Sequence, residues 1–514
     1  MHVPLTTLDF LHRAENVYGA RPGVTDEPNP PGDGLGTIAY AELARRARSL
    51  AVAFDDLGLG AGERIAILSP NAGRFLIALF GIPAHGRVLV PINFRLNRHE
   101  IAYIIEHSGA TALLVDPEYD DLTRDIPVHH RFVLGAETDR DLFERAGTPA
   151  LESNDEAATA TINYTSGTTA RPKGVQMTHR NLWLNAVTFG WHMGVSDRDV
   201  YLHTLPTFHC NGWGLPFALA GMGARQVVLR KVDGEDILDR IEREGVTFLA
   251  GAPAVVTATL DAAEARTHRG ESVPGRGTVR IVVAGAPPPS KVIERVEAEL
   301  GWEFMQIYGL TETSPLLTVN RAPAEYDDLD AADRARRLSR AGVPAIGVRM
   351  RVNGDGELLA RSNHVFEGYW AQPDATAEAV VDGWFHTGDG GELDGAYVVI
   401  SDRKKDVIIS GGENVSSIEI EDCLFQHPAV AEAAAIGVPD DKWGETVKAL
   451  VVLRAGHEDV DEATLIEHCR GRIAHYKCPT SIEFRPELAR TATGKLQKFK
   501  LRAPYWEGRT RQIN

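Results

Sequence analysis

The segment that most constrains this chain is residues 164–175, which read YTSGTTARPKGV. Four hydroxyl side chains surround Gly167, and Lys173 follows six residues later. Glycine lets backbone N–H groups approach an anion closely, while hydroxyls and a lysine add donors and positive charge. The flanking runs 160–164 (ATINY) and 175–177 (VQM) contain β-branched, aromatic and aliphatic residues, which predicts strands. We therefore expect a phosphate-binding loop that joins two strands.

This loop has two alternative interpretations. It is not a Walker A loop, because the G-x-x-x-x-G-K-[ST] pattern is not matched and Lys173 is followed by Gly174. A turn without a ligand would have the same composition, because Ser, Thr and Gly are ordinary turn residues. Other motifs have to decide between a turn and a phosphate site.

Length and composition describe the class of protein. A chain of 514 residues exceeds one hydrophobic core and should divide into domains. A net charge of −17 argues against a nucleic-acid-binding surface, and it means that local positive charge must attract an anionic substrate. The apolar runs near residues 65–91 are interrupted by polar residues, so no membrane span is predicted.

The cysteines and the N-terminus favour a cytoplasmic protein. Cys210, Cys423, Cys469 and Cys478 contain no C-x-x-C pair and are too few for a disulfide scaffold, which fits a reducing compartment. The first residues lack the basic and apolar regions of a signal peptide.

The pattern of apolar runs predicts an α/β fold. Strand candidates at 62–68, 88–90 and 112–116 and a helical pattern at 74–80 predict a large domain of parallel or mixed sheets flanked by helices. Two further strands, 279–285 and 302–308, carry polar and glycine-rich motifs at their carboxyl ends. Ligands of open α/β sheets bind beyond those ends, so both motifs are expected at one cleft.

The chain changes character around residues 401–406. The sequence that follows predicts a hairpin, a helix from about Ser416, two strands and a helix near 462–472. We therefore predict a large N-terminal domain of residues 1–401 and a small α+β domain of residues 402–514. The Asp- and Arg-rich segment 325–340 predicts a solvated helix or loop, with a surface contact to a phosphorylated cofactor as the alternative.

Seven segments together resemble the adenylate-forming (AMP-binding) superfamily of acyl-CoA synthetases, luciferases and peptide-synthetase adenylation domains. Besides 164–175 they are 206–213, 284–287, 306–313, 387–389, 402–414 and 493–498. One match would be weak evidence, whereas seven in the family's order, spread from 164 to 498, are specific. Among the branches, the chain looks most like the acyl-CoA synthetases that activate medium-chain or aryl acids.

The resemblance implies two half-reactions. ATP and a carboxylic acid form an acyl adenylate and pyrophosphate with the help of Mg²⁺, and coenzyme A then displaces AMP. The first step brings two anions together, so cations and oriented donors should dominate catalysis. Lys495 resembles the lysine that contacts the carboxylate and the α-phosphate, Glu312 the Mg²⁺ ligand, and Thr311 an α-phosphate donor. The alternatives are a solvated lysine for Lys495 and a helix N-terminal carboxylate for Glu312.

The resemblance also implies a nucleotide site assembled from several motifs. Tyr308 would stack on adenine, while Asp389 and Arg403 would contact the ribose, whose two hydroxyls a carboxylate can accept together. Residues 387–389 alone could also be a plain turn. The residues expected at the nucleotide are Thr165, Ser166, Gly167, Thr168, Thr169, Lys173, Gly285, Ala286, Pro287, Tyr308, Gly309, Asp389 and Arg403.

The second half-reaction implies a movement of the small domain. Lys405 stands at the family's hinge position, about which the small domain turns and withdraws Lys495. Gly411, Gly412 and Glu413 would then line the path of the pantetheine arm, because two glycines allow close backbone approach. A hairpin turn without that role is the alternative.

The acid is the least constrained ligand. His209 stands where acyl and aryl ligases have an aromatic residue or a histidine, and we include it among the catalytic candidates. Trp213 and Phe217 suggest an apolar slot, although ordinary core aromatics would look the same. No carboxylate occurs in 208–213 to hold an α-ammonium group. A medium-chain, branched or aryl acid is therefore expected.

The acceptor and the partners follow from the same resemblance. No carrier domain follows Lys495, which favours free coenzyme A over a fused carrier. The alternatives are a luciferase-like oxidase, a ligase that loads a separate carrier protein, and a non-catalytic adenylate-binding protein. The joint presence of Lys495, Glu312, Asp389 and Arg403 argues against a decayed site. The expected partners are an acid, ATP and coenzyme A, and a homodimer is compatible with the resemblance.

Overall fold

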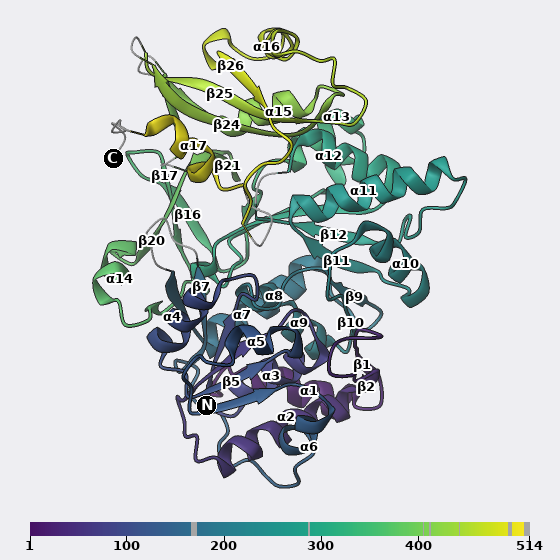
Figure 1. The fold of residues 1–514 in the computed structure, drawn as a ribbon, viewed down its shortest axis with the longest axis vertical. Coiled ribbons are helices and arrows are strands. Elements are labelled where there is room, and N and C mark those ends of the chain that lie inside the picture. Colours follow the sequence, from purple (N-terminus) through teal and green to yellow (C-terminus); the bar gives the residue numbers. More distant parts are fainter. Residues whose placement is uncertain are drawn as a thin grey trace.

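The computed structural model describes residues 1–165, 172–285, 288–403, 406–410, 413–440, 443–491 and 496–507. Three of its sheets lie in the large domain and a fourth, near the C-terminus, lies at the top of Figure 1. The predicted α/β class, with helices packed on mixed sheets, is confirmed. The pairing of strands inside each sheet determines which strand ends come together at the candidate site.

The first sheet has seven strands and contains the strands expected on either side of the phosphate loop. Strands β4, β3, β5 and β6 are parallel, β7 is parallel to β4, and β8 pairs antiparallel with both β7 and β18. In spatial order the strands are β18 (Gly368–Tyr369), β8 (Lys173–Thr178), β7 (Thr159–Thr165), β4 (Val88–Ile92), β3 (Arg64–Leu68), β5 (Ala112–Val115) and β6 (His130–Val133). The strands and the helix predicted between residues 62 and 116 are all present, the helix as α3 (Gly73–Ala84), which is buried along its whole length.

The second sheet has nine strands, of which β10, β9, β11, β12 and β13 run parallel. In spatial order they are β15 (Val343–Pro344), β14 (Thr318–Arg321), β13 (Glu303–Tyr308), β12 (Arg280–Val283), β11 (Phe248–Gly251), β9 (Val200–His203), β10 (Arg225–Val228), β1 (Pro22–Thr25) and β2 (Thr37–Ala39). The predicted strands at 279–285 and 302–308 are therefore neighbours, and their carboxyl ends lie side by side.

Two hydrophobic cores cover the two faces of this second sheet. Successive strand residues alternate between the faces, so Ile281 packs into one core while Val282 packs into the other. One core joins the sheet to α10 (Gly234–Glu244), α11 (Pro253–His268), α12 (Ser290–Arg295) and α13 (Ala331–Leu338). The other fills the space towards the first sheet and includes α1 (Leu8–Tyr18), α2 (Tyr40–Asp56), α3, α7 (His179–Met193) and α9 (Leu215–Met222).

A third, five-stranded sheet connects the large domain to the C-terminal part. It contains β16 (Arg349–Val352), β17 (Glu357–Arg361), β19 (Val380–Val381), β20 (Trp384–Asp394) and β21 (Tyr397–Arg403). β21 pairs antiparallel with β20 as far as Arg403, which lies opposite Asp389. The boundary between residues 401 and 402 stays a prediction.

The C-terminal part has a sheet and a core of its own. The predicted hairpin, helix, two strands and helix appear in that order as β22 (Ile408–Ser410) with β23 (Glu413–Val415), α15 (Ser417–Phe425), β24 (Val430–Asp440), β25 (Gly444–Leu453) and α16 (Glu462–Arg470). β26 (Ser481–Phe484) and α17 (Lys498–Arg502) complete it. Ile408, Ile420, Val447 and Leu465 are fully or almost fully buried in this small core.

One hydrogen-bonded contact connects α15 of the small domain to α12 of the large domain. The Asp422 carboxylate accepts the backbone N–H of Ser290 at 2.8 Å and its hydroxyl at 3.1 Å. Ser290 is the first residue of α12, so a side chain of one domain caps a helix of the other.

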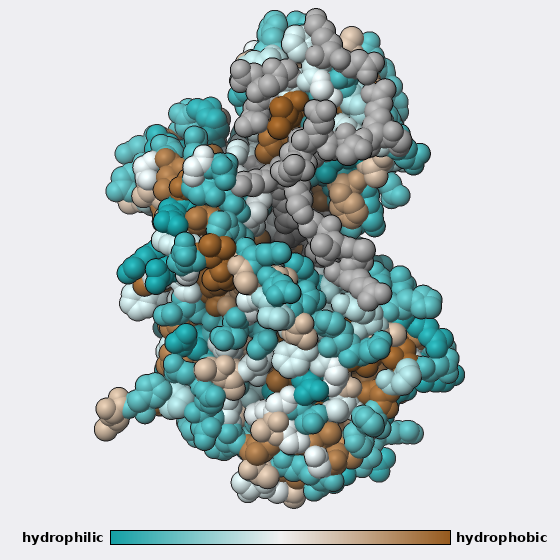
Figure 2. Space-filling view, turned by 90° about the vertical axis from the view of Figure 1, so that its left-hand side faces the viewer, coloured by the Kyte–Doolittle hydropathy of each residue, from teal (hydrophilic) through white to brown (hydrophobic). Residues whose placement is uncertain are grey.

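Figure 2 shows a face that is mostly hydrophilic, with apolar side chains in small, separated patches. Among the described residues, no helix has both the length and the apolar character needed to cross a membrane.

Neutral His179 at the start of α7 generates a prediction about acid stability. Its Nδ1 accepts the backbone N–H of Thr7 at 3.3 Å, so its Nε2 carries the proton and donates to Ser153 Oγ at 2.9 Å. Burial lowers the pKa of His179 to about 4. Between pH 6.5 and 4 the unfolded chain binds the proton and the folded one does not, so stability falls as the pH falls.

We expect the stability advantage of the wild type over His179→Gln to shrink below pH 6.5 by at most about 1.4 kcal/mol per pH unit. Urea unfolding at pH 7.5, 6 and 5 measures the difference. A difference that stays constant across these pH values would show that His179 is not buried in its neutral form.

Candidate active site

Two neighbouring strands of the first sheet, β7 and β8, bring the ends of the predicted phosphate loop together. β7 ends at Thr165 and β8 begins at Lys173, and these two residues lie opposite each other in the antiparallel pair. The expected loop between two strands is confirmed. Its central residues, Ser166, Gly167, Thr168 and Thr169, lie outside the described residues.

The carboxyl end of β13 supplies Tyr308, Gly309, Thr311 and Glu312. A Cβ on Gly309 would lie 1.4 Å from the carbonyl oxygen of Pro315, so only glycine allows the chain to fold back here. Thr311 is buried and its Oγ1 accepts the Cys210 thiol at 3.1 Å. After this turn, Glu312 lines a cavity, whereas the Thr311 hydroxyl is buried against Cys210.

The predicted ribose aspartate lies against the predicted adenine-stacking tyrosine. Tyr308 OH donates to Asp389 Oδ2 at 2.7 Å, and Asp389 is 6 % exposed. Arg403 occupies the register position opposite Asp389 on β21. The Glu357 carboxylate on β17 accepts the backbone N–H of Gly388 at 3.0 Å, which fixes the turn that carries Asp389.

Gly285 lies beyond β12, next to this group. Its φ of 97° is one that L side chains rarely adopt, which accounts for glycine at this position. Ala286 and Pro287, expected to complete the adenine wall, lie outside the described residues.

Tyr369 on β18 contacts two of the predicted site residues. Its hydroxyl donates to Glu312 Oε1 at 2.9 Å, and Lys173 Nζ lies 4.7 Å from the centroid of its ring. A phosphate-loop cation and a candidate metal ligand are thus held by one aromatic side chain.

A cavity of about 240 Å³ brings these groups together. Three separate motifs contribute to its wall: the phosphate loop through Lys173, the β13 turn through Glu312, and the β20 turn through Thr387 and Gly388. Tyr369, Glu357, His386 and Phe385 also line it. The three sheets of the large domain meet at this cavity.

The segment predicted to face the acid has an unusual backbone. Five successive residues have positive φ: Cys210 46°, Asn211 48°, Gly212 60°, Trp213 62° and Gly214 74°. A left-handed conformation costs about 1–2 kcal/mol for each non-glycine residue. The compensating hydrogen bonds run from Cys210 Sγ to Thr311 Oγ1, from Asn211 Nδ2 to Thr161 Oγ1 and from Asn185 Nδ2 to the Trp213 carbonyl. Strain that neighbouring elements hold in place is typical of functional sites.

The side chains expected in the acyl slot differ in their surroundings. His209 is partly exposed and directly precedes the left-handed segment, and Trp213 is buried within it. Phe217 is fully buried on α9, with ring centroids 5.8 Å from Phe10 and 5.3 Å from Phe80. The position of Phe217 matches the interpretation as a core aromatic.

Several predicted residues of the small domain lie outside the described residues, namely Lys405, Gly411, Gly412 and Lys495. The backbone of Glu413 is described and pairs opposite Ser410. Arg490 and Leu496 form an isolated antiparallel bridge.

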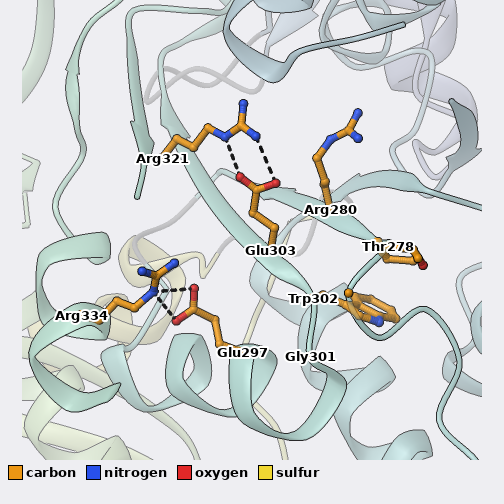
Figure 3. A pocket seen from close by; sticks show the side chains of 10 residues that line it. Thr278, Arg280, Glu297, Gly301, Trp302, Glu303, Arg321 and Arg334 are labelled. Atoms are coloured by element: carbon orange, nitrogen blue, oxygen red, sulfur yellow. Dashed lines mark hydrogen bonds and ion pairs between the residues drawn. The ribbon is translucent and has the colours of Figure 1, made fainter. Parts of the chain in front are cut away.

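A larger cavity of about 590 Å³ lies at the opposite edge of the second sheet, where β12 and β13 begin (Figure 3). Its arginines are paired with carboxylates. Arg321 binds Glu303 at 2.6 Å, Arg334 binds Glu297 at 3.0 Å and Arg280 binds Asp199 at 2.9 Å. Arg334 belongs to the segment 325–340, whose helix is α13. These neutralised cations do not favour the alternative of a contact to a phosphorylated cofactor.

Sequence analysis missed Tyr369 and Glu357. The sequence signal for Tyr369 was the run Gly368-Tyr369-Trp370, in which two aromatic residues follow a glycine between the 306–313 and 387–389 motifs. Glu357 had no signal, because only the pairing of β17 with β20 brings it to the turn.

Comparison with known proteins identifies the family. Residues 11–370 match the family described as AMP-binding enzyme, and residues 419–495 match the AMP-binding enzyme C-terminal domain. The chain belongs to the AMP-binding enzyme family. It is an adenylate-forming acid–thiol ligase that uses ATP, Mg²⁺ and coenzyme A.

Relatives of this AMP-binding enzyme include CoA ligases of several acids. It is 37 % identical to 2-methylpropanoate–CoA ligase of Humulus lupulus over 97 % of this chain and 95 % of the relative. It is 33 % identical to an acetate–CoA ligase of the same plant over 98 % and 95 %. Among solved structures, an anthranilate CoA ligase in complex with anthranoyl-AMP has a TM-score of 0.87 at 26 % identity, covering 98 % of both chains.

The close approach at Gly309 generates a prediction. We expect Gly309→Ala to lower the free energy of unfolding by about 3 kcal/mol or more, because the added methyl group overlaps a backbone oxygen that cannot move independently. Denaturant unfolding measures the effect. Gly354→Ala is the matched control, since its Cβ would meet no atom within 4 Å, and it should change stability by less than about 0.5 kcal/mol. Equal effects of the two substitutions would contradict the geometry of the β13 turn.

Proposed function

We propose that this enzyme joins a short branched, medium-chain or aryl carboxylic acid to free coenzyme A through an acyl adenylate. The observation that carries the proposal is the cavity lined by Lys173, Glu312, Tyr369 and the 387–388 turn. Lys173 is a cation of the phosphate loop, Glu312 is a candidate metal ligand, and residues 387–388 precede the aspartate assigned to the ribose. The one ligand that would contact all three groups is a nucleoside triphosphate.

The first half-reaction is an attack of the acid on the α-phosphate. A carboxylate oxygen forms a bond to the α-phosphorus, the bond to the β-phosphate oxygen breaks, and pyrophosphate leaves. Lys495 and the Thr311 hydroxyl stabilise the charge that develops on the α-phosphate, and Lys173 binds the outgoing phosphates. Mg²⁺ typically uses one or two carboxylates together with phosphate oxygens, so the donor set around Glu312 fits it. When bound, Mg²⁺ neutralises charge on the phosphates.

The nucleoside is held at the other end of the cleft. Tyr308 stacks on adenine while its hydroxyl holds Asp389 in place for the ribose hydroxyls. We also assign Thr165 and Gly285 to the nucleotide, and Arg403, whose backbone lies opposite Asp389 on β21, to the ribose.

The second half-reaction is an attack of the coenzyme A thiolate on the acyl carbonyl carbon, with AMP as the leaving group. We assign Lys405 as the hinge, and Gly411, Gly412 and Glu413 as the path for the pantetheine arm. A rotation of the small domain about residue 405 would break the Asp422–Ser290 contact, which therefore belongs to one of the two domain orientations.

The acid site is assigned to His209 and Trp213, and more weakly to Phe217. Residues 208–213 contain no carboxylate, and Trp213 is buried, which supports an uncharged acyl group. The 2-methylpropanoate ligase named above supports a branched short-chain acid as the first candidate.

The compartment is part of the proposal. The four cysteines are buried and form no disulfide in the described part of the chain, which supports a reducing compartment such as the cytoplasm.

The function is tested with a panel of 2-methylpropanoate, butyrate, octanoate and benzoate, each with ATP, Mg²⁺ and coenzyme A. AMP release and the mass of the thioester are measured. AMP release without a thioester, restored by an acyl carrier protein, would replace coenzyme A by a carrier as acceptor. Absence of acid-dependent AMP release across the panel would contradict the proposed acids.

A matched pair of acids tests the acyl site directly. We predict that kcat/KM for 3-methylbutanoate exceeds that for valine, which has the same skeleton plus an α-amino group, by at least about a thousandfold, or roughly 4 kcal/mol. An ammonium group would enter an apolar site without a partner, which is costly. Comparable rates for both acids would contradict the assignment of residues 208–213 to the acyl group.

A further inference from the structure

Tyr369 lies on a short edge strand whose position is well determined by its neighbours. It pairs opposite Val175 of β8, next to the phosphate loop. Its backbone N–H donates to Thr376 Oγ1 at 2.9 Å, and its ring packs edge-on against Phe366 with centroids 4.8 Å apart. These contacts leave the phenol ring little freedom, so it can act as a fixed support for other groups.

The ring supports two oppositely charged side chains from two different sheets. Its hydroxyl donates to Glu312 Oε1 at 2.9 Å, and its face lies 4.7 Å from Lys173 Nζ. The backbone strengthens the same junction, because the Phe366 N–H donates to the Glu312 carbonyl at 2.8 Å and the Trp370 N–H donates to the Gly174 carbonyl at 2.7 Å. Residues 366–370 therefore clamp the β13 turn to the phosphate loop.

We propose that Tyr369 is a positioning residue for the metal–phosphate end of the site. It orients the Glu312 carboxylate for Mg²⁺ through its hydroxyl, and it holds the Lys173 ammonium for the β- and γ-phosphates over its ring. This inference rests on the proposed function, since it assumes that Glu312 binds the metal.

The chemistry of the hydroxyl suits this role. It contacts Oε1, which leaves Oε2 of Glu312 for the metal. A partner that orients a metal-binding carboxylate typically contributes about 10–100-fold in metal affinity or activity.

The ring and the hydroxyl can be separated by substitution. Tyr369→Phe removes the hydrogen bond to Glu312 and keeps the face over Lys173, whereas Tyr369→Leu removes both. Tyr505→Phe is a matched control in the small domain, because Tyr505 also donates to a glutamate, Glu483, and also lies 5.3 Å from a lysine ammonium, that of Lys448.

The experiment measures binding of α,β-methylene-ATP by titration calorimetry, without acid or coenzyme A, once with Mg²⁺ and once with EDTA. No turnover occurs, so the readout is independent of catalysis. We expect Tyr369→Phe to weaken the Mg²⁺ complex by about 10–100-fold and to leave the metal-free nucleotide unchanged. Tyr369→Leu should weaken both, because Lys173 is also released, and Tyr505→Phe should change neither.

Two outcomes would overturn the inference: an unchanged affinity of Tyr369→Phe for the Mg²⁺ complex, or an equal loss with and without metal. Glu312→Gln separates this failure from that of the proposed function. If nucleotide binding no longer depends on Mg²⁺ in Glu312→Gln but still depends on it in Tyr369→Phe, only the role of Tyr369 is wrong. If nucleotide binding still depends on Mg²⁺ in Glu312→Gln as well, the assignment of Glu312 as the metal ligand is wrong.

Discussion

The active site depends on the carboxyl end of β13, because the residues after this strand contact both other sheets of the large domain. Tyr308 binds Asp389 of the five-stranded sheet, and Glu312 binds Tyr369 of the seven-stranded sheet. Gly309 permits the tight fold-back between the two contacts. Three sheets therefore meet at the turn of residues 308–312, and each sheet brings a different part of the proposed nucleotide site.

Electrostatics explains why the site needs this convergence. The chain carries a net charge of −17, yet its substrates are a carboxylate and a polyphosphate. The three arginines that line the cavity of about 590 Å³, namely Arg280, Arg321 and Arg334, each form an ion pair with a nearby glutamate or aspartate. At the cavity of about 240 Å³, Lys173 Nζ lies 4.7 Å from the centroid of the Tyr369 ring, a cation–π contact that leaves the ammonium charged.

Much of this arrangement could be predicted from the sequence. The strands around the phosphate loop, the two strands that precede Gly285 and Gly309, and the order of elements in the small domain are local patterns, and all of them are confirmed. Tyr369 and Glu357 were missed because their roles depend on strand pairing between distant segments, which no local pattern encodes. The left-handed run at 210–214 was also unpredictable, since Cys210, Asn211 and Trp213 disfavour it and only tertiary hydrogen bonds hold it.

We propose that one cleft serves both half-reactions and that Lys495 serves only the first. The most direct measurement compares both half-reactions in Lys495→Ala: acid-dependent adenylate formation from ATP, and thioester formation from a supplied acyl adenylate and coenzyme A. Lys500→Ala, an exposed lysine on the nearby α17, is the control. The account predicts at least about a hundredfold loss of adenylate formation with thioester formation largely retained. An equal loss of both half-reactions, or the same loss in Lys500→Ala, would contradict it.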